Sequence, residues 1–253
     1  METMVETKCK CKNTTKILAR CVVLVEKAKT EGLNKQEYLE LISYLWVVNH
    51  NDNKLEGLKS LSSCCLDNPF CIARMLDPDC ICSHCYAGAQ QSYQAGLADH
   101  NVINGYILSN VEIPVGIWRI AFSLKVFDCS FFRIESFGDV KNYIHALNYH
   151  HFISAFPSVT FAVWTKNVTL WEKVLNDHGK PANMVYIVSA CELNTVPEKV
   201  SGYADHVFTV YTKEYIESYN VVINCRKKCA ECIKDKANCY FHGTEFYINE
   251  KKK

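Results

Sequence analysis

Four continuous apolar runs in the second half of the chain constrain its fold more than any other feature. They are FFRIES, VTFAVWT, MVYIVSA and HVFTVYT, and they begin at residues 131, 159, 184 and 206. Their spacing of roughly 22 to 28 residues suits one strand plus one helix, and buried parallel strands are continuous apolar runs of this kind. The sequence therefore predicts an α/β fold with helices covering a mostly parallel sheet that is open or closes toward a barrel.

The segments around these runs predict the helices. Residues 14–30 and 35–48 have apolar side chains at helical spacing and predict a hairpin of two helices, and residues 140–156 and 168–175 predict helices between strands. Asp139 is a candidate cap for the third of these. IWRIAF (117–122) is a candidate for one more strand, and EFYINE near the C-terminus is strand-like. We divide the chain into a tail and helical hairpin (1–50) and a main α/β region (51–253).

Cysteine is the outlier of the composition. The chain has 253 residues, 49% of them hydrophobic, and 15 cysteines. A chain of this size can bury a sizeable core without disulfides. No apolar signal-type run follows Met1, and no apolar stretch is long enough to cross a membrane. We therefore expect a reducing compartment, in which clustered thiols indicate metal binding.

Ten of the cysteines fall in two short segments, 64–88 and 225–239. Short spacing lets one loop wrap an iron–sulfur cluster, whereas zinc takes two C-x-x-C-like pairs, which 82–85 and 229–232 could supply together. The clustering predicts a bound metal and leaves iron or zinc open. Three isolated cysteines among apolar residues are expected to be buried packing thiols: Cys21, Cys129 and Cys191.

Four charged residues lie at the ends of the predicted strands, where α/β proteins bind ligands. Alternation along FFRIES places Arg133 and Glu135 on one face of a central strand. Buried charges are costly unless they pair, so we expect an ion pair, either beside a cofactor or purely structural. Asp139 and Lys166 follow two strands on the same rim. All four are candidate cofactor-binding residues, although Asp139 alternatively caps a helix and Lys166 is alternatively solvated.

Other function classes find little support. The formal net charge is +1, so a chain-wide nucleic-acid surface is not expected, and only a local basic patch remains between Cys225 and Lys236. Phosphate-binding, dinucleotide and serine-hydrolase motifs are absent from the sequence. His145, His150 and His151 lack the spacing that aligns metal ligands on a helix, and we expect them to be surface or partly buried residues.

The ordered motifs of the chain resemble the phage gene product 88 family. The likeness runs from about Asn53 to Glu250 and rests on CSHCYAG (Cys82–Gly88), FFRIESFGDV (Phe131–Val140), FAVWTKN (Phe161–Asn167) and the cysteine segment that leads to YINE. The family is similar to radical S-adenosylmethionine proteins, which implies a partial βα barrel and a cysteine loop that holds a [4Fe-4S] cluster. The resemblance also implies the cytoplasm of a bacterial host, and leaves the partner protein or small molecule unknown.

The resemblance also implies a set of ligands. Cys82 and Cys85 match the C-x-x-C-Y-A element, and Cys71 is the third candidate of that loop, with Cys65 and Cys80 as competitors. The C-terminal cysteines match those of the family: Cys225, Cys229, Cys232 and Cys239.

The spacing of the loop departs from the C-x-x-x-C-x-x-C pattern of radical enzymes. The irregular spacing favours a closed cluster with a structural, redox or electron-transfer role. The alternatives are an enzyme with an open iron that binds S-adenosylmethionine, and a zinc-stapled adaptor, so whether the protein is an enzyme stays open.

Overall fold

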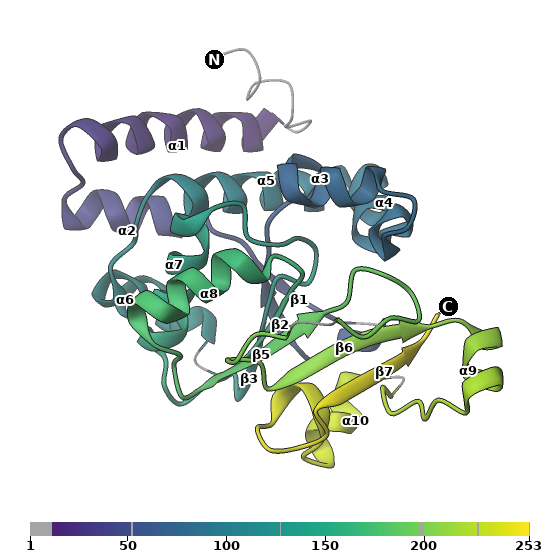
Figure 1. The fold of residues 1–253 in the computed structure, drawn as a ribbon. Coiled ribbons are helices and arrows are strands. Elements are labelled where there is room, and N and C mark those ends of the chain that lie inside the picture. The colour runs from purple at the N-terminus through teal and green to yellow at the C-terminus, as the bar shows by residue number, and fades with distance from the viewer. Residues whose placement is uncertain (1–11, 52, 127, 198–199, 227, 253) are drawn as a thin grey trace.

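The fold is a mixed α/β arrangement around one seven-stranded sheet (Figure 1). The computed structural model describes residues 12–51, 53–126, 128–197, 200–226 and 228–252. The strand order is β1 to β7 as in the sequence, with β1 antiparallel to β2 and every other neighbouring pair parallel. The strands are β1 (Val47–Asn49), β2 (Lys59–Leu61), β3 (Phe131–Ile134), β4 (Thr160–Thr165), β5 (Met184–Ser189), β6 (His206–Tyr211) and β7 (Tyr247–Lys251).

The predicted fold class and the four predicted strands are confirmed, and EFYINE contains β7. Within the described residues the sheet does not close into a barrel. None of the described helices is long and apolar enough to cross a membrane. The longer helices are α1 (Lys12–Thr30), α2 (Lys35–Ser43), α3 (Pro69–Leu76), α4 (Tyr86–Tyr93), α5 (Ala95–Asn110), α6 (Val115–Val126), α7 (Tyr143–Ala155) and α8 (Val168–His178).

The short elements belong to the loops. The C-terminal helices are α9 (Lys213–Tyr219) and α10 (Cys229–Lys234), and the single turns of tighter helix are η2 (Asn53–Leu55), η3 (Cys65–Asp67), η4 (Ile81–His84) and η5 (Asn238–Tyr240).

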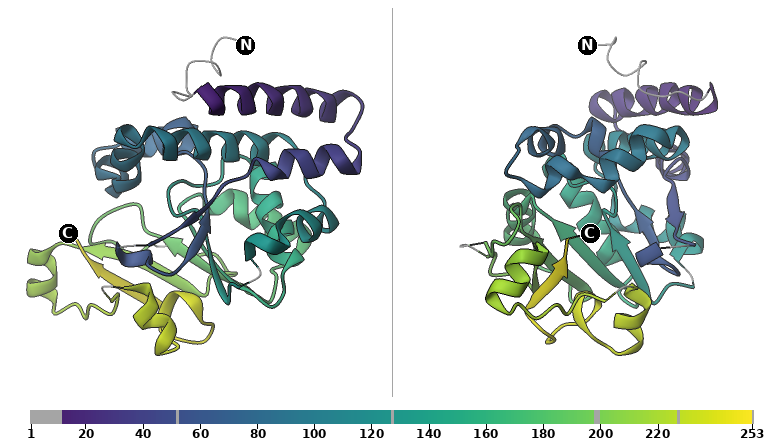
Figure 2. Two further views of the ribbon diagram at one scale, coloured as in Figure 1. Left: turned by 180° about the vertical axis from the view of Figure 1, so that it is seen from behind. Right: turned by 90° about the vertical axis from the view of Figure 1, so that its right-hand side faces the viewer.

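The sequential order of β2 to β5 determines where the helices between them lie. Crossovers between parallel strands are right-handed, so the sequential order of β2 to β5 sends the helices that connect these strands to one face of the sheet. Helices α6, α7 and α8 therefore lie together on one face, as the two further views in Figure 2 also show. We call this the helical face. The large hydrophobic core lies between these helices and alternate side chains of the strands, among them Phe132, Phe161 and Tyr186.

The centre of this core is a group of aromatic rings around Phe152 of α7. The Phe152 ring lies 4.9 Å from Trp118 and 5.1 Å from Phe122, measured between centroids, and 5.0 Å from Phe161. Phe152 is fully buried. Trp118 and Phe122 lie four residues apart on α6, so this segment follows helical spacing, and the expectation of a strand over residues 117–122 is wrong.

The opposite face of the sheet is covered by part of the connection from β6 to β7, which contains the short helix α10. We call residues 225–226 and 228–241 the cap, and the face beneath it the cap face. Its buried cluster joins strand residues to residues of the cap: Leu58, Ala162, Val185, Ile187, Cys229, Cys239, Tyr240 and Ile248. The cap contains only the six-residue α10 and the three-residue η5 as regular structure.

The N-terminal hairpin packs on the helical side through contacts of α1 with α5 and of α2 with α6. Asn34 begins α2 through a capping box, in which its side chain accepts from the Glu37 amide while Glu37 accepts from the Asn34 amide. Helix α2 ends at Ser43, so the expectation of a helix to Val48 is wrong in its last turn, where β1 begins at Val47. The predicted tail lies outside the described residues over 1–11.

Replacing Phe152 by alanine tests the core. We expect Phe152→Ala to lower the free energy of unfolding by about 3–5 kcal/mol, because the removed ring leaves a cavity among rings that cannot collapse into it. Chemical denaturation monitored by circular dichroism measures the change. Leu124→Ala is the control, since Leu124 is 87% exposed and its loss should cost no more than about 0.5 kcal/mol. Equal effects of the two changes would contradict this account of the core.

Candidate functional site

Five thiols of the first cysteine segment come together from four short elements. Cys65 begins η3, Cys71 lies in α3, Cys80 and Cys82 belong to the start of η4, and Cys85 is the N-cap of α4. Cys65, Cys71 and Cys85 pack in one small cluster, and the Cys82 amide donates to the Cys80 sulfur at 3.5 Å. We call this set the loop thiols. The structure therefore brings together all five loop cysteines that the sequence nominated.

The loop thiols differ in acidity. The neighbouring Cys65 thiol lowers the pKa of Cys85 to about 6, and the amides of Gly88 and Ala87 at the start of α4 contribute. The Gly88 amide donates to the Cys85 sulfur at 3.4 Å. Burial raises the pKa of Cys82 to about 12. The start of α4 thus favours the thiolate form of Cys85, as helix N-termini do for other cysteines.

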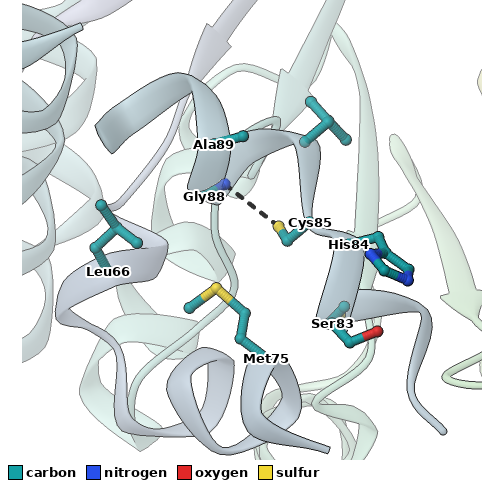
Figure 3. Close-up of a pocket in the computed structure, with 9 residues that line it drawn as sticks. Leu66, Met75, Ser83, His84, Cys85, Gly88 and Ala89 are labelled. Atoms are coloured by element: carbon teal, nitrogen blue, oxygen red, sulfur yellow. Dashed lines mark hydrogen bonds between the residues drawn. The ribbon is translucent and has the colours of Figure 1, made fainter. Parts of the chain in front are cut away.

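A pocket of about 350 Å³ opens beside these thiols (Figure 3). Cys85 and Met75 bring their sulfur atoms to it, and Figure 3 shows the bond between the Gly88 amide and Cys85. Leu66 on one side and His84 on the other complete a lining that is more apolar than polar. The pocket gives a small molecule or a partner side chain access to the thiols.

Lys166 lies at the end of β4 beside the same thiols. Its ammonium group donates to the Ser189 hydroxyl at 3.1 Å. Burial opposes its charge, yet the negative groups of Cys82, Asp139 and Cys191 raise the pKa of Lys166. Among the described residues no carboxylate lies within ion-pair distance of it. Lys166 is therefore a partly buried cation, not the fully solvated one that the sequence left as an alternative.

Cys191 belongs to this site, and sequence reasoning missed it by treating it as a packing thiol. Its backbone carbonyl accepts from the Ile81 amide at 2.6 Å, and the next residue, Glu192, forms a β-bridge with Cys80. Cys191 follows the end of β5 by two residues. Its position just after β5, at the same carboxyl edge of the sheet as Lys166, could have indicated from the sequence that Cys191 lies in the site.

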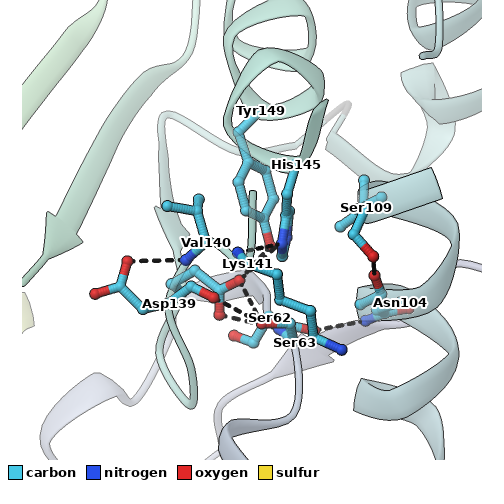
Figure 4. A network of polar contacts seen from close by, with 12 residues as sticks. Ser62, Ser63, Asn104, Ser109, Asp139, Val140, Lys141, His145 and Tyr149 are labelled. Carbon is cyan, nitrogen blue, oxygen red and sulfur yellow. Dashed lines mark hydrogen bonds and ion pairs between the residues drawn. The ribbon is translucent and has the colours of Figure 1, made fainter. Parts of the chain in front are cut away.

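Glu135 is held in a buried polar network with Ser63 and Tyr149, which Figure 4 labels. Its carboxylate accepts from the Ser63 amide at 2.9 Å, the Ser63 hydroxyl at 2.8 Å and the Tyr149 hydroxyl at 2.9 Å. His145 Nε2 lies 3.4 Å away and is fully buried, so the expectation of a surface or partly buried His145 is wrong. Burial raises the pKa of Glu135 to about 7 and lowers that of His145 well below its usual value.

Arg133 does not form the expected ion pair with Glu135. The Glu135 backbone has a φ of +53°, which breaks the strand alternation and turns the carboxylate toward α7. Arg133 remains on the cap face, where its guanidinium lies 3.1 Å from the centroid of the Trp164 ring. It is 7% exposed and has no ion pair with any residue that the structure describes. Arg133 and Glu135 therefore serve opposite faces of the sheet.

Asp139 joins the ends of two strands and does not cap a helix. Its carboxylate accepts from the Thr165 hydroxyl at 2.6 Å and from the Lys166 amide at 2.8 Å, beyond the end of β4. Helix α7 begins later, with Asn142 as its cap, so the helix-cap interpretation of Asp139 is wrong. Burial raises the pKa of Asp139. Asp139 thus fixes the position of Lys166 beside the loop thiols.

The four C-terminal thiols belong to the cap, and three of them, Cys225, Cys229 and Cys239, pack in its cluster on the sheet. Burial, together with the charges of the other three, raises the pKa of Cys239 well above its usual value. Lys54 donates to the Cys225 sulfur at 3.1 Å and also pairs with Glu250. The predicted basic patch around them is partly neutralised, because Arg226 pairs with Asp235 and Lys228 with Glu56, while residue 227 lies outside the described residues.

The donor set suits a metal bound by thiolates. None of the thirteen described cysteines forms a disulfide. Their side chains, as placed in the described part of the chain, do not form a group of three or more ligands arranged around a metal position. Soft sulfur donors with cations nearby nevertheless match the chemistry of iron–sulfur and zinc centres.

The chain belongs to the gene product 88 family, whose family model matches residues 22–246. The match includes both cysteine segments, β3 and β4. Searches of curated proteins and of solved structures found no match.

Gly138 offers a test of the contacts that hold β3 to the cysteine loop. A Cβ atom there would lie 2.7 Å from the Ser63 carbonyl oxygen and 2.9 Å from the Glu135 carboxylate. We expect Gly138→Ala to cost about 1–3 kcal/mol of unfolding free energy, because backbone must shift. Gly116→Ala in α6 is the control: it meets nothing within 4 Å and should be neutral or slightly stabilising. A neutral Gly138→Ala would contradict this packing.

The raised pKa of Glu135 predicts that the free energy of unfolding depends on pH. Its pKa rises from 4.5 in the unfolded chain to about 7 in the folded one, so the folded state binds the proton more tightly. This contribution is fully present below pH 4.5 and is lost as the pH rises toward 7, by up to about 3 kcal/mol.

The difference between wild type and Glu135→Gln isolates this contribution, because the effect of His145 is common to both. Denaturation at a series of pH values should show wild type losing stability relative to the variant between pH 4.5 and 7. A pH-independent difference would show that Glu135 titrates at its ordinary pKa.

Proposed function

We propose that this protein is an iron–sulfur protein that holds a [4Fe-4S] cluster with its loop thiols, in a structural, redox or electron-transfer role. The observation that carries the proposal is Lys166, a partly buried cation beside the thiols of Cys80, Cys82 and Cys191. An ammonium that loses hydration is costly unless an opposite charge faces it, and among the described residues no carboxylate lies within ion-pair distance of this one. A cluster with thiolate ligands would supply the missing negative charge.

The ligands would come from the loop that passes the end of the sheet. Cys71, Cys82 and Cys85 are the first candidates, and Cys85 already has the low pKa that a ligand thiolate requires. Cys65, which packs with Cys85, and Cys80 remain as further candidates. A site with more than three nearby thiols supports a closed cluster, in which four thiolates leave no iron vacant.

A second candidate function is a radical S-adenosylmethionine-type enzyme with an open iron. The observation that favours it is the sequential, parallel order of β2 to β7, which is the strand order of a partial βα barrel. Asp139 and Lys166 would then place polar groups beside the open iron. A zinc-stapled adaptor is the third possibility. In each case the clustered free thiols favour the reducing cytoplasm of a bacterial host.

Metal analysis of anaerobically purified protein separates these functions. We expect iron and acid-labile sulfide in matched amounts. Zinc alone at stoichiometric level would discard both iron-based functions. Paramagnetic resonance of the reduced protein, with and without S-adenosylmethionine, then distinguishes them: an unchanged spectrum supports the closed cluster, and a changed spectrum supports the open iron.

Single cysteine variants test the ligand assignment. Cys82→Ala should reduce the iron and sulfide content of the loop site and its absorbance, because a ligand beside Lys166 is lost. Cys21→Ala is the matched control, since Cys21 is fully buried in the helical core and should not affect the metal. Equal metal content in both variants and in wild type would refute the assignment.

A further inference from the structure

The two groups of thiols lie at different places on the sheet. Figures 1 and 2 show the loop helices α3 and α4 above the sheet and α10 of the cap below it in every view. Cys65 and Cys85 pack in a small buried cluster with Phe137, whereas Cys229 and Cys239 pack in the cap-face cluster with Ala162. Each group thus has its own buried surroundings.

The strand β4 gives a scale for this separation. The cap thiols pack with Ala162, and the loop thiols lie beside Lys166, four residues further along the chain. At a rise of 3.3 Å per residue, these positions lie about 13 Å apart. Two sulfurs that share one zinc ion lie at most about 4.6 Å apart, because each Zn–S bond is about 2.3 Å. The cap thiols are therefore poorly placed to complete the loop centre.

The cap thiols also have cations of their own. Lys54 donates to the Cys225 sulfur at 3.1 Å. Arg133 is buried without an ion-pair partner among the described residues, its Nε has no hydrogen-bond partner, and its positive charge lowers the pKa of Cys229 and Cys239 against the effect of burial. A centre with four thiolate ligands carries excess negative charge, and the buried Arg133 and partly buried Lys54 beside it would balance that charge.

The cap requires a source of stability beyond its apolar contacts. It crosses the cap face with nine residues of helical structure in α10 and η5, and two residues near its end, Lys236 and Asn238, have positive φ. Asn238 also directs its side-chain amide to the Cys232 sulfur at 3.8 Å. Short irregular segments of this kind are commonly held by a structural metal, whose binding energy becomes folding energy.

We propose that Cys225, Cys229, Cys232 and Cys239 form a second metal centre, separate from the loop site, which fastens the cap to the sheet. Four thiolates from one short segment bind either zinc or an iron–sulfur cluster, and both use the same ligands. On binding, each thiol releases its proton and its sulfur becomes a ligand. The centre is closed, because the cap supplies all four ligands, and it does not depend on the loop cluster.

Paired double variants test the separation. Full-length wild type, Cys229→Ser/Cys232→Ser and Cys82→Ser/Cys85→Ser are purified without oxygen, and iron, sulfide and zinc are measured per chain. Cys129→Ser is the control outside both groups. We expect each double variant to lose the metal of its own group and to keep the metal of the other. Zinc loss or iron and sulfide loss from the cap variant identifies the metal of the cap.

The outcomes distinguish this inference from the proposed function. If the cap variant retains the full metal content of wild type, the second centre is refuted and the loop cluster stands. If the loop variant retains the full content while the cap variant loses its metal, the loop cluster is refuted and the cap centre stands. If either double variant abolishes all metal that wild type binds, the two groups form one centre and the separation is wrong.

Alkylation of the unaltered chain provides a second measurement that needs no variant. Cys225 is only partly buried, so its protection reports on metal and not on burial alone. Mass spectrometry after iodoacetamide treatment should show Cys225 protected before, and alkylated after, metal removal with a chelator. Alkylation of Cys225 to the same extent before and after removal would overturn the proposal.

Discussion

The constraint on which the structure depends is the one-sidedness of a sheet whose parallel strands follow their order in the chain. Because β2 to β5 are sequential, the right-handed crossovers between them place α6, α7 and α8 on a single face. The other face would expose Ala162, Val185 and Ile187 unless another segment covered it. The cap performs this task with little regular structure, and its four cysteines are the feature that distinguishes it from an ordinary loop. The fold and the cysteine pattern are thus linked, because the segment with the four cysteines covers the face that the helices leave open.

The second organising feature is positive charge beside the thiols, from the buried Arg133 and the partly buried Lys54 and Lys166. Lys166 lies beside the loop thiols, Lys54 contacts Cys225, and Arg133 lies on the Trp164 ring close to the cap thiols. A cation is stable away from water when its attraction to an anionic partner offsets the free energy of its lost hydration. Each group of thiols thus lies beside cations of its own, and this supports a separate metal centre in the loop and in the cap.

Much of the fold could be predicted from the sequence, because buried parallel strands leave long apolar runs that few other structures produce. The strand predicted at 117–122 failed because an apolar run is ambiguous between strand and buried helix, and packing on Phe152 decided for helix. The sequence indicated which cysteines of the loop belong to the site. It did not indicate how these cysteines and the neighbouring charged residues are arranged. No local pattern shows that Glu135 adopts positive φ and turns away from Arg133, that Asp139 binds across two strand ends, or that Cys191 joins the loop thiols. These depend on contacts between segments distant in the sequence.

The central claim is that the loop thiols beside Lys166 bind iron and sulfide. X-ray absorption at the iron edge, on protein prepared without oxygen and carrying the Cys229→Ser/Cys232→Ser change in the cap, tests it most directly. The account predicts iron surrounded by sulfur with a second iron as a near neighbour. Iron coordinated only by oxygen and nitrogen, or no iron at all, would contradict it.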